Sequence, residues 1–201
     1  MKNGLIYPIV DFLIITLKHI NLVELYKKLL VTIFKNQDRL TINRIAIDSF
    51  IIIKWIAVIL LLINHVSNLL TTIVVWYLLF SNLYTYFYYH IWINDTANDQ
   101  HNTPERIRRR FLNLLTSIGF SNLCFAFLYR FPYLGDFEWS EKLPLTTKAL
   151  WFSFANSLTA SYEFVKPITK DGVNLTIMQL IISFVFLTMI LGNSIPKTNN
   201  N

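Results

Sequence analysis

The residues best suited to chemistry lie together near the end of the chain. A five-residue segment brings three hydroxyl groups and one carboxylate together: Thr159, Ala160, Ser161, Tyr162 and Glu163. A carboxylate that is repeated around a pore favours cations over anions. The segment therefore predicts a site for a cation, with Glu163 as its charged member. The alternative for Glu163 is a solvated carboxylate in an outer loop, or one paired with the lysine three residues later.

Other kinds of chemistry are not indicated. The four histidines, His19, His65, His90 and His101, are dispersed and lack the spacing of metal ligands. No phosphate-binding loop is present, and the single cysteine, Cys124, cannot form a disulfide within the chain. We therefore expect no enzymatic activity, no bound metal and no cofactor, only a permeant monovalent cation such as potassium or sodium.

The composition is that of an integral membrane protein. Of 201 residues, 54% are apolar and 15% are charged, whereas about a quarter are charged in a typical soluble domain. A bilayer would cover this apolar surface. The net charge of +6 comes from short basic clusters beside apolar runs, which is typical of cytosolic loops and not of a nucleic-acid-binding surface. We expect a protein of the cell membrane that binds no nucleic acid.

Four apolar runs predict membrane-spanning helices, at about residues 49–65, 68–92, 111–129 and 173–195. A short polar turn at 64–68 joins the first two runs into a hairpin. Lys54 is the one charged residue of the first run and lies about five residues into it. We expect this lysine to snorkel toward the cytosolic interface, the alternative being a function within the membrane.

The first 48 residues predict helices at the membrane surface. Leu22, Leu25, Tyr26, Leu29 and Ile33 recur at helical spacing, with lysines mostly on the other side. This pattern favours an amphipathic helix that lies on the cytosolic membrane surface or packs beneath a pore. A spanning helix over residues 5–20 is the alternative, which an aspartate near its centre disfavours.

Four arginines precede the third apolar run: Arg106, Arg108, Arg109 and Arg110. They lack the regular spacing within an apolar helix that a voltage sensor requires. The cluster predicts a topology anchor that is attracted to anionic lipid. Because two spans separate it from the basic N-terminal region, both regions are expected in the cytosol. Two further spans then return the C-terminus to the cytosol.

A short segment between the third and fourth runs does not fit a span. Residues 147–158 would form a helix of roughly 18 Å, whereas the hydrocarbon core is roughly 30 Å thick. Pro144 precedes the segment, as is typical just before a helix. The segment therefore predicts a re-entrant half-helix, followed by a loop at residues 159–164. Such a loop persists at membrane depth only where protein or water covers it, as in a pore.

The sequence of this region resembles the potassium ion channel family. Residues 149–164 are similar to the family's pore helix and selectivity filter, with Thr-Ala-Ser-Tyr-Glu-Phe where the family has Thr-Val-Gly-Tyr-Gly-Asp. Pro167, Thr169 and Gly172 match its downstream Pro-x-Thr-x-x-Gly motif. The resemblance covers residues 111–195. It implies a homotetramer with a pore between the subunits, in which Thr159 would coordinate the ion.

The chain departs from the family at both filter glycines, which are replaced by Ser161 and Glu163. A left-handed backbone conformation costs a non-glycine residue about 1–2 kcal/mol. Two such residues in each of four subunits would cost roughly 8–16 kcal/mol. We therefore predict that the standard potassium filter does not form and that the pore is wider and weakly selective. The alternative is a non-conducting membrane interaction or regulatory protein, for example a membrane component of a toxin or defence system.

One face of the final span contains Gln179, Ser183, Phe186 and Ile190. We expect this face to line the pore, with Phe186 and Ile190 as a hydrophobic gate. The alternative is that the face packs against the third span.

Together these patterns predict an all-α membrane protein with about four transmembrane helices, a re-entrant pore helix and an N-terminal amphipathic helix. The expected divisions, in chain order, are interfacial helices (1–48), a transmembrane hairpin (49–93), a basic cytosolic loop (94–110), a channel-like pore module (111–196) and a disordered tail (197–201). The expected partners are the lipid bilayer, other copies of the chain in a homotetramer and a regulatory protein.

Overall fold

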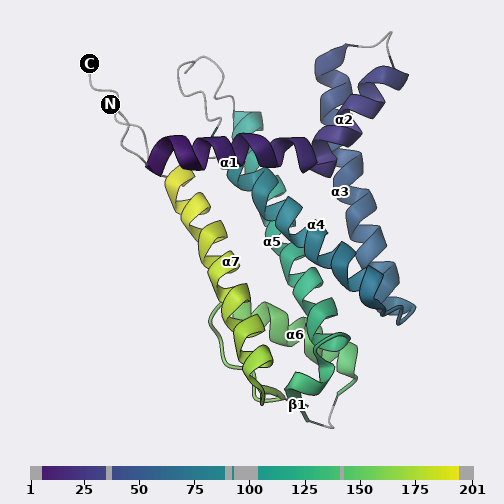
Figure 1. Ribbon diagram of the computed structural model, residues 1–201, viewed down its shortest axis with the longest axis vertical. Coiled ribbons are helices and arrows are strands. Elements are labelled where there is room, and N and C mark those ends of the chain that lie inside the picture. Colours follow the sequence, from purple (N-terminus) through teal and green to yellow (C-terminus); the bar gives the residue numbers. More distant parts are fainter. Residues whose placement is uncertain (1–5, 35–37, 89–91, 93–103, 141–142, 195–201) are drawn as a thin grey trace. The chain divides into compact units, whose positions relative to one another are not determined.

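Helices dominate the structure, a computed structural model that describes residues 6–34, 38–88, 92, 104–140 and 143–194 (Figure 1). The helices are α1 (Ile6–Ile20), α2 (Leu22–Ile33), α3 (Arg39–Ile63), α4 (Leu69–Phe87), α5 (Pro104–Arg130), α6 (Leu145–Ser157) and α7 (Lys170–Ser194). A short 3-10 helix, η3 (Leu134–Asp136), and two strands, β1 (Phe137–Trp139) and β2 (Val165–Pro167), complete the described elements. The tail at 197–201 and most of the loop at 94–110 lie outside the described residues.

Four of the described helices are long and apolar enough to cross a membrane. The candidate spans are Thr41–Ile63, Leu69–Phe87, Phe111–Arg130 and Lys170–Met189. The prediction of an all-α membrane protein with four spans is confirmed at this level. The prediction missed the pair of strands, because elements of three residues are too short to show a periodic pattern.

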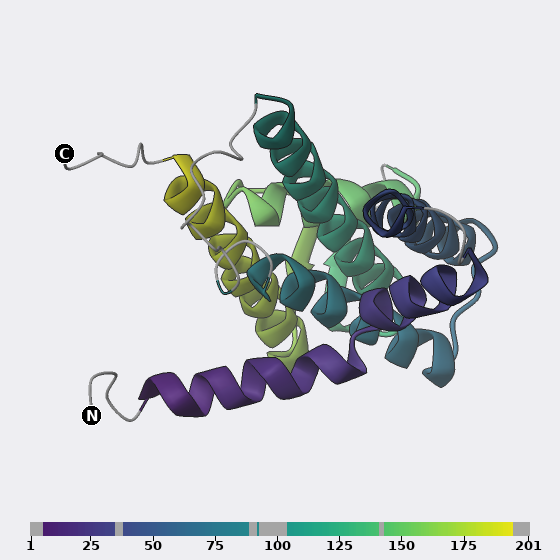
Figure 2. The ribbon, with the colours of Figure 1, turned by 90° about the horizontal axis from the view of Figure 1, so that it is seen from above.

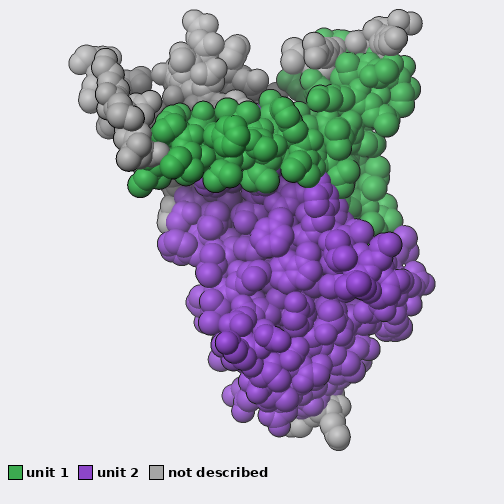
Figure 3. All heavy atoms as spheres, in the orientation of Figure 1, with its two compact units in different colours: residues 1–57 green, residues 58–201 purple. Residues whose placement is uncertain are grey.

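The chain divides into two compact units, residues 1–57 and 58–201 (Figure 3). The boundary between them along the sequence falls within α3. In the first unit, α1 and α2 differ in direction by 50° (Figure 2). Asn21 lies at the bend and caps α2, because its side-chain oxygen accepts a hydrogen bond from the Val23 N–H at 3.1 Å. Tyr26 joins α2 to α3, with its hydroxyl oxygen 3.3 Å from Ser49 Oγ.

The helix that contains Lys54 begins earlier than the sequence indicated. Polar residues after position 38 hid its first turns, and the structure extends α3 back to Arg39. Lys54 therefore lies 13 residues after Thr41 and nine residues before Ile63, near the middle of the candidate span. It is buried, as is Ala46 two turns before it. The predicted position five residues into the span is wrong, and Lys54 lies about 20 Å along the helix from its polar end.

The second unit contains three helices that lie side by side, α4, α5 and α7 (Figures 1 and 2). The Asn82 side-chain amide donates to the Ser117 carbonyl at 3.1 Å, and the Ser117 hydroxyl donates to Asn82 Oδ1 at 2.8 Å. Tyr86 donates to the Asn113 carbonyl at 2.5 Å. Small polar residues of this kind hold helices together in membranes, where apolar contact gives no preference over lipid.

A strand clip ties the end of α5 to the start of α7. We use this name for residues 136–139 and 165–169. β1 and β2 pair antiparallel, with Glu138 opposite Lys166. Next to them, Asp136 Oδ1 accepts a hydrogen bond from the Thr169 hydroxyl at 2.6 Å, and the Asp136 carbonyl accepts one from the Ile168 N–H at 2.9 Å. The clip therefore holds together the segments that precede and follow α6.

Gly172 is required by the clip. The Thr169 hydroxyl caps α7 by accepting from the Gly172 N–H at 3.1 Å. A Cβ atom at position 172 would lie 2.6 Å from the Asp136 carbonyl oxygen. The motif Pro-x-Thr-x-x-Gly thus has a local explanation in this chain: a strand residue, a helix cap and a close approach of two backbones.

We predict that Gly172→Ala lowers the thermal stability of the purified protein. Alanine favours a helix by up to about 1 kcal/mol over glycine, but overpacking costs about 1–3 kcal/mol, and the backbone at Asp136 is fixed by its own hydrogen bonds. The expected decrease in Tm is several degrees, measured by thermal unfolding in detergent. The matched control is Gly135→Ala, because a Cβ there meets nothing within 4 Å. Equal Tm values for the two variants would contradict the role of the close approach.

Candidate functional site: the short helix and its loop

α6 is too short to cross a membrane. It contains 13 residues and is therefore about 20 Å long, against roughly 30 Å for the hydrocarbon core. It begins after Pro144 and ends at Ser157, close to the predicted segment 147–158. Its position in the chain, between two helices that are long enough to span, agrees with the layout expected from the sequence.

Gln179 on α7 is the centre of the contacts that hold α6. This side chain is only 1% exposed. Its Nε2 donates to the carbonyl and to the hydroxyl of Ser153, both at 2.8 Å, and lies 3.3 Å from Asn122 Oδ1. Its Oε1 accepts from the Tyr129 hydroxyl at 2.6 Å and from Asn156 Nδ2 at 2.9 Å. The amide therefore has partners on both α5 and α6.

Further hydrogen bonds extend this cluster. Asn156 Nδ2 donates to the Thr176 carbonyl at 3.1 Å. The Ser153 hydroxyl donates to the Asn122 carbonyl at 2.7 Å, and Asn122 Nδ2 donates to Ser157 Oγ at 3.1 Å. We call the six side chains the polar core: Asn122, Tyr129, Ser153, Asn156, Ser157 and Gln179. All six are buried, so the polar core fixes one face of α6 between two spanning helices.

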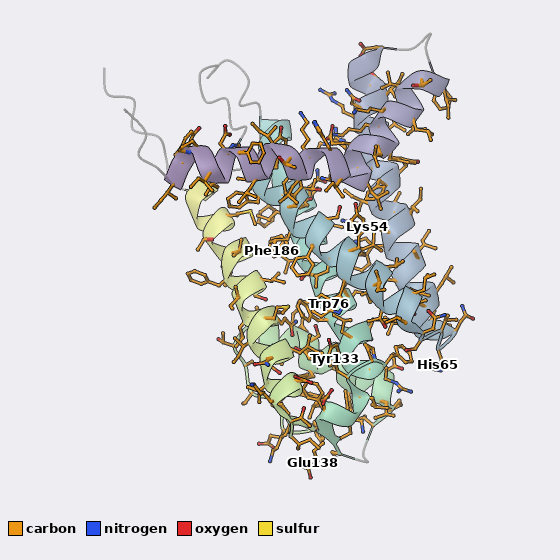
Figure 4. The ribbon with its side chains drawn as sticks, viewed as in Figure 1. Lys54, His65, Trp76, Tyr133, Glu138 and Phe186 are labelled. Atoms are coloured by element: carbon orange, nitrogen blue, oxygen red, sulfur yellow. The ribbon has the colours of Figure 1, made fainter. Side chains whose placement is uncertain are left out.

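The polar core changes the interpretation of the predicted pore lining. Gln179 and Phe186 both lie inside the unit, each 1% exposed. The Phe186 ring packs 6.2 Å from the Tyr86 ring of α4, on the side of α7 that faces α4 (Figure 4). Ser183 is half-buried, and the side chain of Ile190 lies outside the described residues. Gln179 therefore packs against α5 and α6, and Phe186 packs against α4. Neither side chain lies on an exposed face of α7 that could line a pore.

The loop after α6 begins with a Schellman turn. The Ala160 N–H donates to the Ala155 carbonyl at 2.8 Å, and the Thr159 N–H donates to the Asn156 carbonyl at 3.0 Å. Thr159 occupies the left-handed position of this motif, with φ of 58°. Glycine usually takes this position, and the conformation costs a non-glycine residue about 1–2 kcal/mol.

The rest of the predicted filter is open to its surroundings. Thr159, Ala160, Ser161 and Glu163 are exposed, and Tyr162 is partly buried. Its ring lies 5.3 Å from that of Phe164, and its burial raises the pKa of Tyr162 above the ordinary value of a phenol. Among described non-glycine residues, positive φ occurs only at Thr159 and His65. Ser161 and Glu163 therefore do not adopt the left-handed conformation of filter glycines.

Glu163 does not pair with the lysine three residues later. Within the described residues no salt bridge joins Glu163 to Lys166. Lys166 instead stands opposite Glu138 in the strand clip. Of the two alternatives considered for Glu163, the ion pair is absent from the described structure, and the carboxylate is exposed.

Sequence reasoning missed two features of the site. One is Lys148, which is buried, donates to the Ser140 carbonyl and lies 6.0 Å from the centre of the Trp139 ring. The polar core was also missed. Its signal was the helical spacing of Ser153, Asn156 and Ser157 within an otherwise apolar segment, which marks a polar face on α6.

The predicted lipid anchor is described in part. Arg108 is exposed and Arg109 is half-buried at the start of α5. The side chains of Arg106 and Arg110 lie outside the described residues. The two described arginines are placed where cationic groups flank the apolar part of a span.

A comparison with known proteins found no matching family model, no matching curated protein and no matching solved structure. The resemblance to potassium channels therefore rests on the residues of the chain itself.

We predict that Gln179→Met lowers stability far more than a matched change on the exposed side of the same helix. The substitution leaves the partners on α5 and α6 without the amide, and each buried group left unsatisfied costs about 1–3 kcal/mol. The control is Thr188→Val, which removes an exposed hydroxyl that bonds only its own helix. The measurement is Tm in detergent together with hydrogen exchange of α6. Unchanged protection of α6 in Gln179→Met would show that the polar core does not hold this helix.

We also predict opposite effects of glycine at two positions of the loop. Thr159→Gly relieves the left-handed strain and should stabilise the protein by about 1 kcal/mol. Ser161→Gly relieves no strain and only increases the entropy of the unfolded chain, so it should be neutral or destabilising by about 0.5–1 kcal/mol. Thermal unfolding of both variants gives the test. The same sign for both would mean that strain at Thr159 is absent in the folded protein.

Proposed function

We propose that this chain is a subunit of a cation channel, in which copies assemble as a tetramer around a pore with an altered, weakly selective filter. The observation that carries the proposal is α6. A 13-residue helix enters between two candidate spans, is fixed there by buried polar groups, and is followed by an exposed non-helical loop. This arrangement supports a re-entrant helix and a pore loop.

The backbone of the loop supports assembly around water. Within the described residues, the N–H groups of Ser161, Tyr162, Glu163 and Phe164 have no hydrogen-bond partner. Lipid cannot satisfy such groups, which cost several kcal/mol each in hydrocarbon. In this proposal water in a central pore, or a neighbouring copy of the chain, covers them.

Electrostatics favour a cation at this place. The carboxylate of Glu163 is exposed, and four copies would form a ring. The C-terminal end of α6 adds a negative potential at the start of the loop. A pore with these groups would favour cations over anions without the dehydrated carbonyl sites of a potassium filter, because Ser161 and Glu163 do not adopt the glycine conformation.

The pore-lining face of α7 is revised in this proposal. Gln179 and Phe186 are held inside the subunit, so the lining must come from the exposed side of the helix. The exposed residues at helical spacing there are Ile177, Ile181, Phe184 and Thr188. Phe184 takes the place of Phe186 as the candidate for a hydrophobic gate.

The proposed topology places both termini and the arginine cluster in the cytosol, and the strand clip outside. The described arginines, Arg108 and Arg109, would meet anionic headgroups of the inner leaflet. Basic residues on the cytosolic flank of a span support this orientation. The membrane in this proposal is the cell membrane.

A non-conducting role is the second candidate, and one observation favours it. The Schellman turn directs the chain back over the end of α6, and its N–H groups bond to helix carbonyls. Such a loop would close the path of an ion if the turn persisted in the assembly. The chain would then serve as a membrane-bound interaction or regulatory subunit.

We predict that Glu163→Gln reduces the preference for cations over anions in planar bilayers that contain the purified protein. Loss of four carboxylates from the pore loop removes the charge that attracts cations. Recordings in potassium, sodium and calcium, with reversal potentials in salt gradients, measure the effect. The matched control is Glu138→Gln, which removes an exposed carboxylate from β1 and should leave the ratio unchanged.

Two results would contradict the channel proposal. One is an absence of current from protein that is shown to be inserted and tetrameric. The other is an equal change of selectivity in both variants, which would place the effect in surface charge and not in the loop.

A further inference from the structure

The apolar stripe of α2 faces outward. Four of its members, Leu22, Leu25, Leu29 and Ile33, are exposed, Ile33 by 61%. The opposite side is more buried, and Val23 on it is the one buried residue of α2. Lys27 Nζ lies 2.8 Å from Glu24 Oε1, and these side chains are only 13% and 17% exposed. Tyr26, which is also partly buried, contacts Ser49 and packs 5.7 Å from the ring of Phe50 on α3.

The same reversal occurs in α1. Ile14 is its one buried residue. Asp11 and Lys18 are partly buried and lie three residues before and four residues after Ile14, on the same stripe. The large apolar residues of the remaining surface are exposed: Ile6, Tyr7, Ile9, Phe12, Leu13, Ile15, Leu17 and Ile20. Most large apolar groups of both helices are thus exposed, whereas four of the charged residues, Asp11, Lys18, Glu24 and Lys27, are partly buried and Lys28 is exposed.

This pattern is opposite to that of a helix that faces water. In water, charged side chains stay exposed, and burial of apolar surface drives packing. An amphipathic helix at a membrane surface also directs its charges toward water. In α1, apolar residues extend around most of the circumference. A helix of this kind is covered on all sides, either by protein or by acyl chains.

The bend between the two helices is suited to an apolar environment. Asn21 is 3% exposed, and its side chain is bonded to the Val23 N–H. The Asn21 N–H donates to the Lys18 carbonyl at 3.3 Å, and the Asn21 carbonyl accepts from the Glu24 N–H at 3.0 Å. A break in a helix is tolerated within a membrane when its backbone groups are satisfied in this way.

We propose that α1 and α2 form a broken segment embedded in the bilayer, with the outward stripe of each helix in contact with lipid acyl chains. Length and composition agree with this proposal, because the two helices together are long and apolar enough for one membrane span. The 50° bend between them makes that segment a broken one. Acyl chains are favoured over a partner protein because exposed apolar side chains continue along the length of both helices, and the exposed residues among them that can carry a charge are His19 and Lys28. This inference does not depend on whether the chain conducts ions.

Depth measurements on the full-length protein test the proposal. In a Cys124→Ser background, single cysteines at Leu13 and Leu25 report the outward stripes, and Ile14→Cys reports the covered stripe of α1. Two positions serve as references, Phe80→Cys on the exposed side of the candidate span in α4 and Glu138→Cys on the polar surface of β1. Each is labelled with an environment-sensitive fluorophore and reconstituted into vesicles of phosphatidylcholine and phosphatidylglycerol.

The expected result is quenching of the labels at Leu13 and Leu25 by lipids with a spin label in the acyl chain, to the level of Phe80. Aqueous iodide should quench only the label at Glu138 to a large extent, and the label at Ile14 should respond weakly to both. Strong iodide quenching at Leu13 and Leu25 would overturn the proposal in favour of a water-facing helix. Weak response to both quenchers would overturn it in favour of a second copy or another protein. A lipid response at only one of the two positions would exclude a joint segment. Circular dichroism confirms that each variant retains its helical content.

Discussion

The amide of Gln179 determines where the short helix lies. In an apolar setting this group must form hydrogen bonds within the protein, and the structure provides them only from α5 and α6. The rotation of α7 and the depth of α6 are therefore fixed by the same group. A bundle that packed only by apolar contact would have no such preference, since lipid chains are equally good partners. The position of the exposed loop follows from this constraint, because the loop starts where the polar core ends.

The strand clip and the polar core act at opposite ends of the same substructure. The clip joins the chain before and after α6 through paired strands and the bond between Asp136 and Thr169. The polar core holds the helix itself. Between these two attachments, the N–H groups of Thr159 and Ala160 bond to the last turn of α6, and these hydrogen bonds hold Thr159 in its strained conformation. The strain is small relative to the contacts on either side of it.

Sequence reasoning succeeded where length and hydropathy determine the outcome. The four candidate spans, the turn before α4 and the short helix all follow from the size of apolar runs. Helix ends were placed within a few residues except at the starts of α3 and α5 and at the end of α4. It failed where a choice among neighbours decides the structure. Periodicity placed Gln179 and Phe186 on one face but could not say whether that face meets a pore or α5. The apolar stripe of α2 shows the same limit. Its spacing indicated a helix but could not say whether the stripe faces lipid or protein. Lys54 was misplaced because hydropathy assigns the start of a span to the first apolar residue, and the polar turns before it are also helical.

The strand clip has a consequence for how the loop can change over evolution. Both ends of the segment that carries α6 and its loop are fixed by strand pairing, a helix cap and the close approach at Gly172, none of which uses a side chain from residues 158–164. Substitutions in those residues therefore cost little folding free energy. Residues 158–164 can therefore change while the architecture stays intact, so selection on what the loop does is separated from selection on whether the protein folds.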